Sequence, residues 1–314
     1  MTFTTDSTST PGESAPSESY SGCMQSALLI VSYGLGLDST AMTVLLYQLG
    51  MRPDIIVFAD TGAEKPETYA YLDVFNAWLR SVGFPEVTVV QYEPTRAPYS
   101  TLEDKCLTNE NLPSLAFRGH ECALVFKREP ITKFLKAHPL VQAAIASGRA
   151  IHKLIGYDDS AADRKRSVKT TAGRLKVVQQ IEERRSCGKA PLADQWEAAH
   201  MTNVYMLQDR NLSRPMLPAI VQSVGLPVPV KSACFFCPAS RPEEVVELKL
   251  THPELFERAL HIERVAQGGK HQTRQGLSIG LWHWAWLADC DDPAKASAVI
   301  KARTGKDVKD GLRP

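Results

Sequence analysis

The stretch Ala27-Leu-Leu-Ile-Val-Ser-Tyr-Gly-Leu-Gly-Leu-Asp-Ser-Thr40 decides how this chain folds. Its first six residues are almost entirely apolar, which is typical of a strand buried on both faces of a parallel sheet. A glycine turn follows at Gly34-Leu-Gly36, and residues 41–49 then repeat apolar side chains with the period of a helix, ending before Gly50. We therefore expect a strand, a glycine turn and a helix in that order.

Three further apolar segments extend this pattern along the chain. Residues 54–59, 87–90 and 150–155 each have the composition of a buried strand, and a helix with its apolar side chains on one face is expected after Pro66. Strands that alternate with helices form parallel sheets covered by helices on both faces. The predicted fold class is therefore α/β, with a doubly wound, mostly parallel sheet.

Composition and length limit the class of protein. The chain has 314 residues, a formal net charge of +1 and 44% hydrophobic residues. This ordinary globular mixture argues against a chain that coats nucleic acid by bulk charge. No apolar run approaches the roughly 20 residues that span a bilayer, and no secretory signal is expected. The seven cysteines are then expected to be reduced or metal-bound, in a cytoplasmic protein without membrane contact.

The chain divides into three predicted parts. Residues 1–24 are expected to be a disordered tail, because residues 1–22 contain eleven Ser or Thr and no Lys or Arg. Residues 25–200 are expected to form the α/β domain. Residues 201–314 are expected to form a C-terminal extension that holds helices and the segment Cys234-Phe-Phe-Cys237.

The glycine turn is a candidate anion site, since backbone amides and the helix dipole point at it. A Walker A loop is excluded, because it requires Gly-Lys-Ser/Thr where this chain has Leu37-Asp-Ser39. A dinucleotide fingerprint needs Gly at Ser39, although Asp60 stands near the distance expected for a ribose-binding acid. Asp38 would repel a pyrophosphate unless a divalent cation lay between them, which favours ATP with Mg²⁺ over NAD. A turn without a ligand is the remaining alternative.

Five blocks, in order over residues 27–264, give the chain a family resemblance. The first block is Ser32-Tyr-Gly-Leu-Gly-Leu-Asp-Ser-Thr40. It resembles the pyrophosphate loop (PP-loop) of ATP pyrophosphatases, in particular that of their phosphoadenosine phosphosulfate (PAPS) reductase-like branch. Leu35 stands where a glycine is usual in that loop. The others are Phe58-Ala-Asp-Thr-Gly62 with Glu64-x-Pro-Glu-Thr-Tyr69, Cys122-x4-Lys127-x2-Pro130, Ile155-Gly-Tyr157 with Asp163-Arg164, and Lys231-Ser-Ala-Cys-Phe-Phe-Cys-Pro238 with His252-Pro-Glu254.

This resemblance implies an adenine nucleotide alpha hydrolase-like fold and an enzyme that attacks the α–β bond of ATP. A substrate oxygen is adenylated and pyrophosphate leaves, with loop amides and Mg²⁺ stabilising its charge. The expected use is sulfur transfer or nucleic-acid modification, with a sulfur-donor protein as a candidate partner. The catalytic residues implied are Asp38, Lys127 and Arg164. The nucleotide-binding residues implied are Ser32, Gly34, Gly36, Ser39, Thr40, Asp60, Gly62 and Gly156.

Two other functions stay open. A PAPS or APS reductase is the alternative enzyme. The resemblance implies that such a reductase carries a catalytic cysteine in a C-terminal Glu-Cys-Gly-Leu-His segment, whereas Asp289-Cys290-Asp291 lacks the Gly and the His. The second alternative is a non-catalytic subunit that binds a nucleotide or a nucleic acid.

Cys234-x-x-Cys237 is the clearest candidate for a metal site. Two thiolates at this spacing can hold Zn²⁺ or an iron–sulfur cluster, and a redox dithiol or two core cysteines are the alternatives. The family resemblance adds Cys122 as a third ligand, with Cys106 or His120 as candidates for the fourth. We expect a [4Fe–4S] cluster, with Zn²⁺ as the alternative, because an open iron suits sulfur chemistry.

Residues 164–176 contain a basic run without an acid. A solvated helix face is the usual explanation of such a run. Because the run follows a strand end on the expected nucleotide face, contact with a triphosphate or a nucleic-acid backbone is the alternative. Its cations are Arg164, Lys165, Arg166, Lys169, Arg174 and Lys176.

Overall fold

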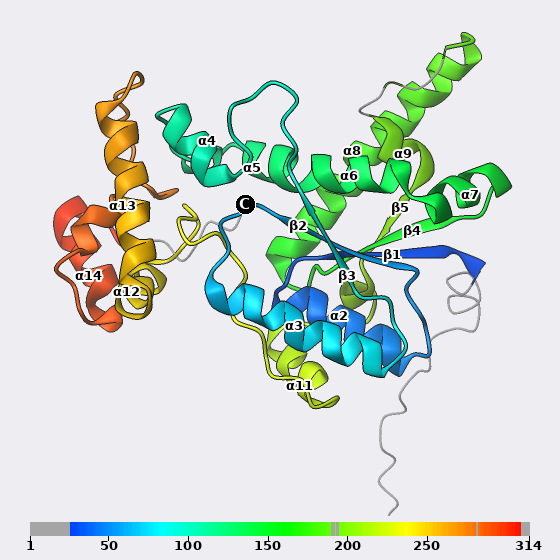
Figure 1. The fold of residues 1–314 in the computed structure, drawn as a ribbon, viewed down its shortest axis with the longest axis horizontal. Coiled ribbons are helices and arrows are strands. Elements are labelled where there is room, and N and C mark those ends of the chain that lie inside the picture. The colour runs from blue at the N-terminus through cyan, green and yellow to red at the C-terminus, as the bar shows by residue number, and fades with distance from the viewer. Residues whose placement is uncertain (1–25, 190–191, 193–194, 281, 309–314) are drawn as a thin grey trace, which may run out of the picture.

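The structure is a computed structural model that describes residues 26–189, 192, 195–280 and 282–308, so the tail expected at residues 1–24 lies outside the described residues. Five parallel strands form one sheet in the order β3-β2-β1-β4-β5 (Figure 1). The predicted α/β fold with a parallel sheet is confirmed. The strands are β1 (Leu28–Tyr33), β2 (Ile55–Asp60), β3 (Val87–Gln91), β4 (Ile151–Ile155) and β5 (Thr202–Val204).

β1 lies at the centre of the sheet, as its apolar composition requires. Val31 is in register with Ile56 of β2 on one side and with Leu154 of β4 on the other. The chain adds β2 and β3 on one side of β1 and then returns to add β4 and β5 on the other. This reversal leaves a crevice outside the carboxyl ends of β1 and β4, where ligands of doubly wound folds bind.

Helices cover both faces of the sheet, because successive strand residues point to opposite sides. Leu29 and Val31 pack into one core with α2 (Leu37–Gln48), α3 (Pro66–Ser81) and α11 (Leu217–Gln222). Leu28 and Ile30 pack into a second core with α6 (Glu129–Ala137) and α7 (Pro139–Ser147). Both layers are visible on either side of the strands in Figure 1.

The α/β part extends past the boundary expected at residue 200. β5 pairs with β4, and Met206, Leu207 and Leu226 pack into the same core as β1. A separate apolar core follows, which Figure 1 places at one end of the molecule. It joins α4 (Leu102–Thr108) to α12 (Pro242–Thr251), α13 (Pro253–Gly268) and α14 (Pro293–Thr304).

α8 (Ala161–Ser186) carries the basic run and projects away from the sheet (Figure 1). No helix of the described ranges is both long and apolar enough to cross a bilayer. The remaining segments are η1 (Ser114–Phe117), α5 (Glu121–Ala123), the π-helical turn η2 (Leu124–Arg128), α9 (Trp196–His200), α10 (Met206–Asp209), η4 (Arg214–Met216) and η5 (Trp284–Leu287).

Candidate functional site

The glycine turn joins the end of β1 to the start of α2. Gly36 is the N-cap of the 12-residue helix α2, and its carbonyl accepts a hydrogen bond from Thr40 Oγ1 at 2.9 Å. The Gly34 amide donates to Ser39 Oγ at 3.1 Å. The unpaired amides of the first helical turn therefore face the crevice at the sheet edge, which suits an anion.

Leu35 occupies the turn position at which the related loops carry glycine. Its φ is 55°, in the left-handed region that glycine adopts without cost. The Leu35 side chain is fully buried in the core beneath α2. Burial of a leucine contributes about 1.5–3 kcal/mol, which offsets the roughly 1–2 kcal/mol that the left-handed backbone costs.

An open cleft of about 1040 Å³ lies in the crevice at the ends of β1 and β4. This volume is at the upper end of the range of small-molecule sites. Backbone and small side chains form its floor, and cations outnumber acids on its walls. The cations are Lys127, Arg166, Arg214, Lys231 and Arg241, and the acids are Asp38 and Glu244. The cleft therefore favours a ligand with several negative charges.

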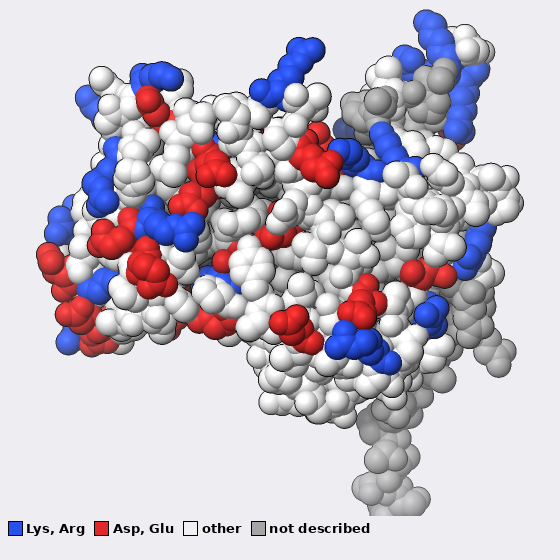
Figure 2. Space-filling view, viewed as in Figure 1, with Lys and Arg blue, Asp and Glu red and all other residues white. Residues whose placement is uncertain are grey.

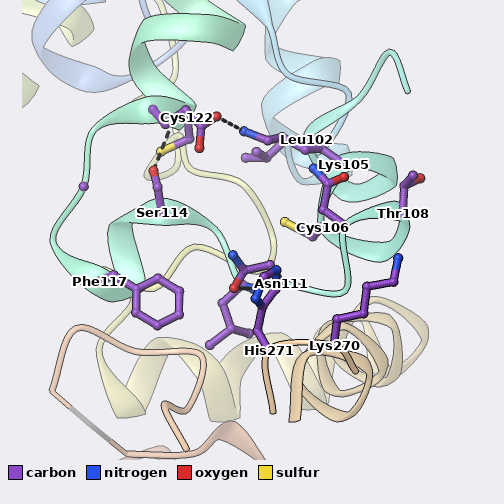
Figure 3. Close-up of a pocket in the computed structure, with 14 residues that line it drawn as sticks. Leu102, Lys105, Cys106, Thr108, Asn111, Ser114, Phe117, Cys122, Lys270 and His271 are labelled. Carbon is purple, nitrogen blue, oxygen red and sulfur yellow. Dashed lines mark hydrogen bonds and ion pairs between the residues drawn. The ribbon is translucent and has the colours of Figure 1, made fainter. Parts of the chain in front are cut away.

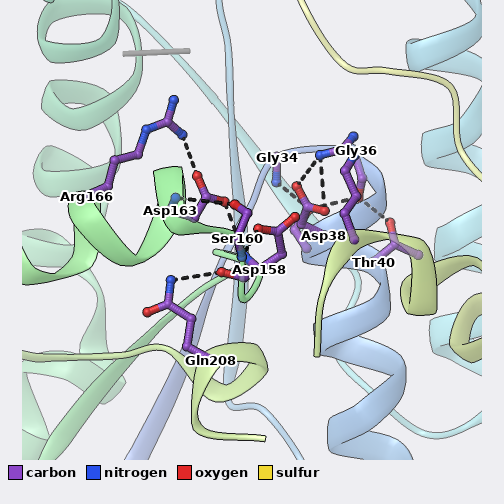
Figure 4. A network of polar contacts seen from close by, with 11 residues as sticks. Gly34, Gly36, Asp38, Thr40, Asp158, Ser160, Asp163, Arg166 and Gln208 are labelled. Atoms are coloured by element: carbon purple, nitrogen blue, oxygen red, sulfur yellow. Dashed lines mark hydrogen bonds and ion pairs between the residues drawn. The ribbon is translucent and has the colours of Figure 1, made fainter. Parts of the chain in front are cut away.

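Asp38, in the first turn of α2, forms an ion pair with Arg214 of η4. Arg214 Nη1 donates to Asp38 Oδ2 at 2.9 Å and to Oδ1 at 3.3 Å, and Figure 4 shows Asp38 at the start of α2. The carboxylate that would otherwise repel an anion at the glycine loop is thereby neutralised. Asp38 thus ties the start of α2 to η4.

The segment after β4 forms the opposite wall of the cleft. Tyr157 lines it, with the Arg166 guanidinium 5.8 Å from the ring centroid. Arg166 Nη1 donates to Asp163 Oδ1 at 3.0 Å, and Gln208 Nε2 donates to the Asp158 carbonyl at 3.0 Å (Figure 4). This network ties the start of α8 to α10 and holds Arg166 against the cleft.

Gly156 lies where β4 meets α2. A Cβ on this residue would stand 2.7 Å from the Ser39 amide nitrogen. Only glycine allows the backbone after β4 to approach the glycine loop this closely.

Glu64 lies beneath the Cys234–Cys237 segment, to which it is joined by a β-bridge at Cys234. Its side chain is completely buried, and its Oε1 lies 3.8 Å from Lys127 Nζ. Burial raises the pKa of Glu64, against the attraction of Lys127. Burial also acts to lower the pKa of Lys127, but the attraction of Glu64 opposes it and that pKa is raised.

The three cysteines predicted to share a metal come from two segments, with Cys122 in α5 and the other two in the Cys234–Cys237 segment. Cys237 lines the cleft, and Cys234 Sγ lies 3.1 Å from Thr61 Oγ1. Burial raises the pKa of both thiols, so they are protonated in this arrangement. Within the described residues, no group of three His, Cys, Asp or Glu side chains is placed to hold a metal ion. As placed in the structure, the three cysteines therefore do not form the site expected for a cluster or for Zn²⁺.

A second cavity, of about 490 Å³, lies between α4 and the segment from η1 to α5 (Figure 3). Cys106 and Cys122 both line it, together with Lys270 and His271. Burial raises the pKa of Cys106 to about 12. Cys106 thus faces Cys122 and not the Cys234–Cys237 segment, and the His120 side chain is exposed and does not line this cavity.

The structure brings only part of the predicted site together. The predicted residues that line the cleft are Ser32, Gly34, Gly36, Asp38, Ser39, Lys127, Gly156 and Cys237. Thr40 is fully buried and bonds to Tyr33 and to the Gly36 carbonyl, so it does not face the cleft. Asp60 accepts hydrogen bonds from Gly62 N, Tyr69 and Gln91, and it braces the turn after β2 instead.

Arg164 is also placed away from the cleft. Its side chain is paired with Asp159 and donates to Asn211 at 3.3 Å. Arg166, Arg214, Lys231 and Arg241 supply the cleft's charge but were not among the predicted nucleotide or catalytic residues. Arg166 belonged to the basic run, whereas no motif marked Arg214, because its partner Asp38 lies 176 residues away in the sequence.

Comparisons with known proteins concern the same elements. A family model described as "Phosphoadenosine phosphosulfate reductase domain" matches residues 28–150. No curated protein matches the chain. Among solved structures, the chain is similar to the U34-tRNA thiolase NcsA from Methanococcus maripaludis with its [4Fe–4S] cluster, at 13% identity and a TM-score of 0.38, over 81% of this chain and 83% of that one.

The matched residues include β1, the glycine turn, α2, β2, α3, β3 and the segment that holds Cys122 and Lys127. These elements form the glycine-loop side of the cleft and end just before β4. The match to the phosphoadenosine phosphosulfate reductase domain thus covers the glycine-loop side of the cleft, over residues 28–150.

Proposed function

We propose that this protein is a PP-loop ATP pyrophosphatase that adenylates an acceptor during sulfur transfer. The observation that carries the proposal is the cation-lined cleft at the start of α2, with the glycine turn as its floor. A triphosphate on this floor would meet the first amides of α2 and the guanidinium groups of Arg166 and Arg214. Tyr157 offers an aromatic face in the same cleft.

The residues present fit ATP and leave one carboxylate for Mg²⁺. Gly34 and Gly36 let the phosphates approach the backbone, and Asp38 is the acid nearest to them in the sequence of the loop. Mg²⁺, when bound, would neutralise phosphate charge next to Asp38. Arg214 holds that carboxylate in place until then.

The reaction proposed is attack of an acceptor oxygen on the α-phosphorus of ATP. The new bond joins that oxygen to phosphorus, the α–β phosphoanhydride bond breaks, and pyrophosphate leaves with the bonding electron pair. The hydroxyl proton of the acceptor is released to bulk water. Donors fixed around the β and γ phosphates would stabilise the charge that develops on the leaving group. In this chain those donors are the loop amides, Arg166, Arg214 and Lys127.

Sulfur chemistry is assigned to the wall that Cys237 lines. Cys237 lines the same cleft as Lys127, so a thiol stands beside the place where the activated acceptor would lie. A sulfur-donor protein is the partner that this proposal implies. The metal centre predicted from the sequence has no part in these steps.

The products formed from Mg·ATP test this proposal. We expect AMP and pyrophosphate, and a change to Arg166→Ala should weaken ATP binding by about tenfold or more, since a charge-assisted hydrogen bond contributes about 1.5–3 kcal/mol. Arg264→Ala is the matched control, because Arg264 is 58% exposed on α13.

ADP and inorganic phosphate as products would overturn the proposal. Sulfite release from an adenylyl sulfate, without pyrophosphate from ATP, would favour a reductase instead. ATP affinity that is equal in the unaltered chain and in Arg166→Ala would remove the cleft as the nucleotide site.

A further inference from the structure

α8 is a long helix that the fold of the α/β domain does not need. Its 26 residues extend about 39 Å, and only Asp163, Ser167 and Ile181 are buried. Its first two turns form the cleft wall through Arg166. Further along, α8 packs against α9 on one side, where Arg174 donates to the Met201 carbonyl at 2.9 Å, and most of its remaining surface is exposed (Figure 1). A helix so exposed stays available for a partner.

Three lysines form a row along one face of α8. Lys165, Lys169 and Lys176 are exposed, and their spacing of four and then seven residues places them within about 40° of one another around the helix. They lie about 6 Å and about 10.5 Å apart along the axis. In the described part of the chain, no ion pair with an acid is found for any of the three.

The stretch of α8 that carries the lysine row has no acidic residue of its own. Residues 164–181 contain no Asp or Glu. Figure 2 shows Lys and Arg side chains gathered over the far end of α8. Like charges on one helix repel each other and lower its stability, so this pattern is not explained by the needs of the fold.

We propose that the lysine row of α8 binds the phosphate backbone of a nucleic acid, which is then the acceptor substrate of the cleft. The inference rests on the proposed function for the identity of the acceptor. A strand laid along the row would meet the lysines at intervals of about two and about three nucleotides, at 3.4 Å for each step of a strand. Because the row begins one residue from Arg166, the same strand reaches the cleft.

A nucleic acid fits these observations better than an acidic polypeptide does. The row joins a cleft whose floor and cations suit phosphates, so one polyanion can occupy both. Val168 and Leu175, which are 68% and 54% exposed, lie beside the lysines and offer apolar contact to sugars and bases. Binding by the lysine row is expected to depend on the charge and spacing of the phosphates and not on the base sequence.

The test compares two triple variants of the full chain. One is Lys165→Gln with Lys169→Gln and Lys176→Gln. The control is Lys295→Gln with Lys301→Gln and Lys306→Gln, which makes the same change in net charge in and just after α14, at the other end of the molecule. Binding of a fluorescein-labelled single-stranded RNA longer than α8, and of a DNA duplex of the same sequence, is measured by anisotropy over a series of salt concentrations.

The α8 variant should bind the RNA about tenfold or more weakly, with a salt slope smaller by about 2, since each phosphate contact contributes about 0.7 to the slope for a single strand. The duplex arm shows which nucleic acid the row prefers. The control variant should keep the affinity and slope of the unaltered chain. ATP binding without RNA should be equal in all three proteins. A failure of the proposed ATP site can thus be told apart from a failure of the lysine row to bind nucleic acid.

Three results would overturn the inference. The first is no binding of either probe by the unaltered chain. The second is an equal loss of affinity in both triple variants, which would indicate net charge alone. The third is stronger competition by polyglutamate than by unlabelled RNA, which would point to an acidic protein. Circular dichroism of each variant shows that α8 remains helical.

Discussion

Gly62 offers a direct test of how the turn after β2 is packed. Its φ is 71°, and a Cβ on it would stand 2.6 Å from Thr101 Cγ2 and 3.0 Å from Thr101 Cβ. Gly62→Ala therefore introduces both backbone strain and a collision. Gly148, at the end of α7, has the same φ of 71° but no heavy atom within 4 Å of its would-be Cβ. Gly148→Ala thus introduces the strain alone.

The magnitudes follow from these two environments. Alanine in the left-handed region costs about 1–2 kcal/mol, and about 0.4–1 kcal/mol is regained because the unfolded chain loses freedom. Gly148→Ala should then lower the free energy of unfolding by about 0.5–1 kcal/mol. Gly62→Ala adds overpacking, at about 1–3 kcal/mol, so its total loss should be about 2–4 kcal/mol.

Urea unfolding of the two variants measures this difference. Thr101→Ser removes the colliding methyl group and keeps the hydroxyl that accepts a hydrogen bond from Asp104 N at 3.1 Å, which caps α4. Combined with Gly62→Ala it should recover at least about half of the extra loss. Because Gly62 does not line the cleft, ATP affinity of the folded Gly62→Ala protein should stay unchanged.

Equal losses in Gly62→Ala and Gly148→Ala would refute the reasoning, since the collision would then cost nothing. A Gly62→Ala variant that Thr101→Ser fails to rescue would refute the assignment of the collision to that methyl group. If the folded Gly62→Ala protein lost ATP affinity, Gly62 would be a nucleotide-binding residue, as the sequence predicted.

Two further predictions concern charge and metal. Burial acts to raise the pKa of Glu197, but Lys153, at 3.1 Å, opposes it and that pKa is lowered. The ion pair therefore stabilises the fold above the ordinary pKa of a glutamate. This stabilisation is lost as the pH falls through the lowered pKa of Glu197. Glu197→Gln should lower the free energy of unfolding by about 3 kcal/mol at pH 7. The difference in urea midpoint between this variant and the unaltered chain should shrink as the pH is lowered, and a difference that stays constant with pH would contradict the prediction. The sequence predicts a [4Fe–4S] cluster, whereas the three cysteines as placed form no metal site, and anaerobic reconstitution decides between the two. A cluster would appear as a brown colour that Cys→Ser changes at Cys122, Cys234 or Cys237 abolish and that Cys187→Ser, on the exposed residue after α8, does not. A protein that stays colourless with iron and sulfide supplied would show that the three thiols do not gather on a cluster.

The sequence by itself determined the sheet and the position of the cleft. Apolar runs such as residues 27–32 can be buried only inside a parallel sheet, and a glycine turn between such a strand and a helix leaves amides unpaired at the sheet edge. Both effects act over a few residues, so they can be recognised without knowing what packs against them. The glycine turn, Asp38 and Gly156 accordingly lie where they were expected.

Tertiary structure decided which charged side chains face that cleft. Arg164 and Arg166 are two residues apart, hence about 200° apart around α8, and the burial of Asp163 and Ser167 turns Arg166 inward and Arg164 out. Arg214 reaches Asp38 only because η4 packs beside the start of α2. These placements depend on how distant segments pack, which the local pattern of residues does not contain. The loop and Lys127 could therefore be predicted from the sequence, whereas the arginines of the cleft could not.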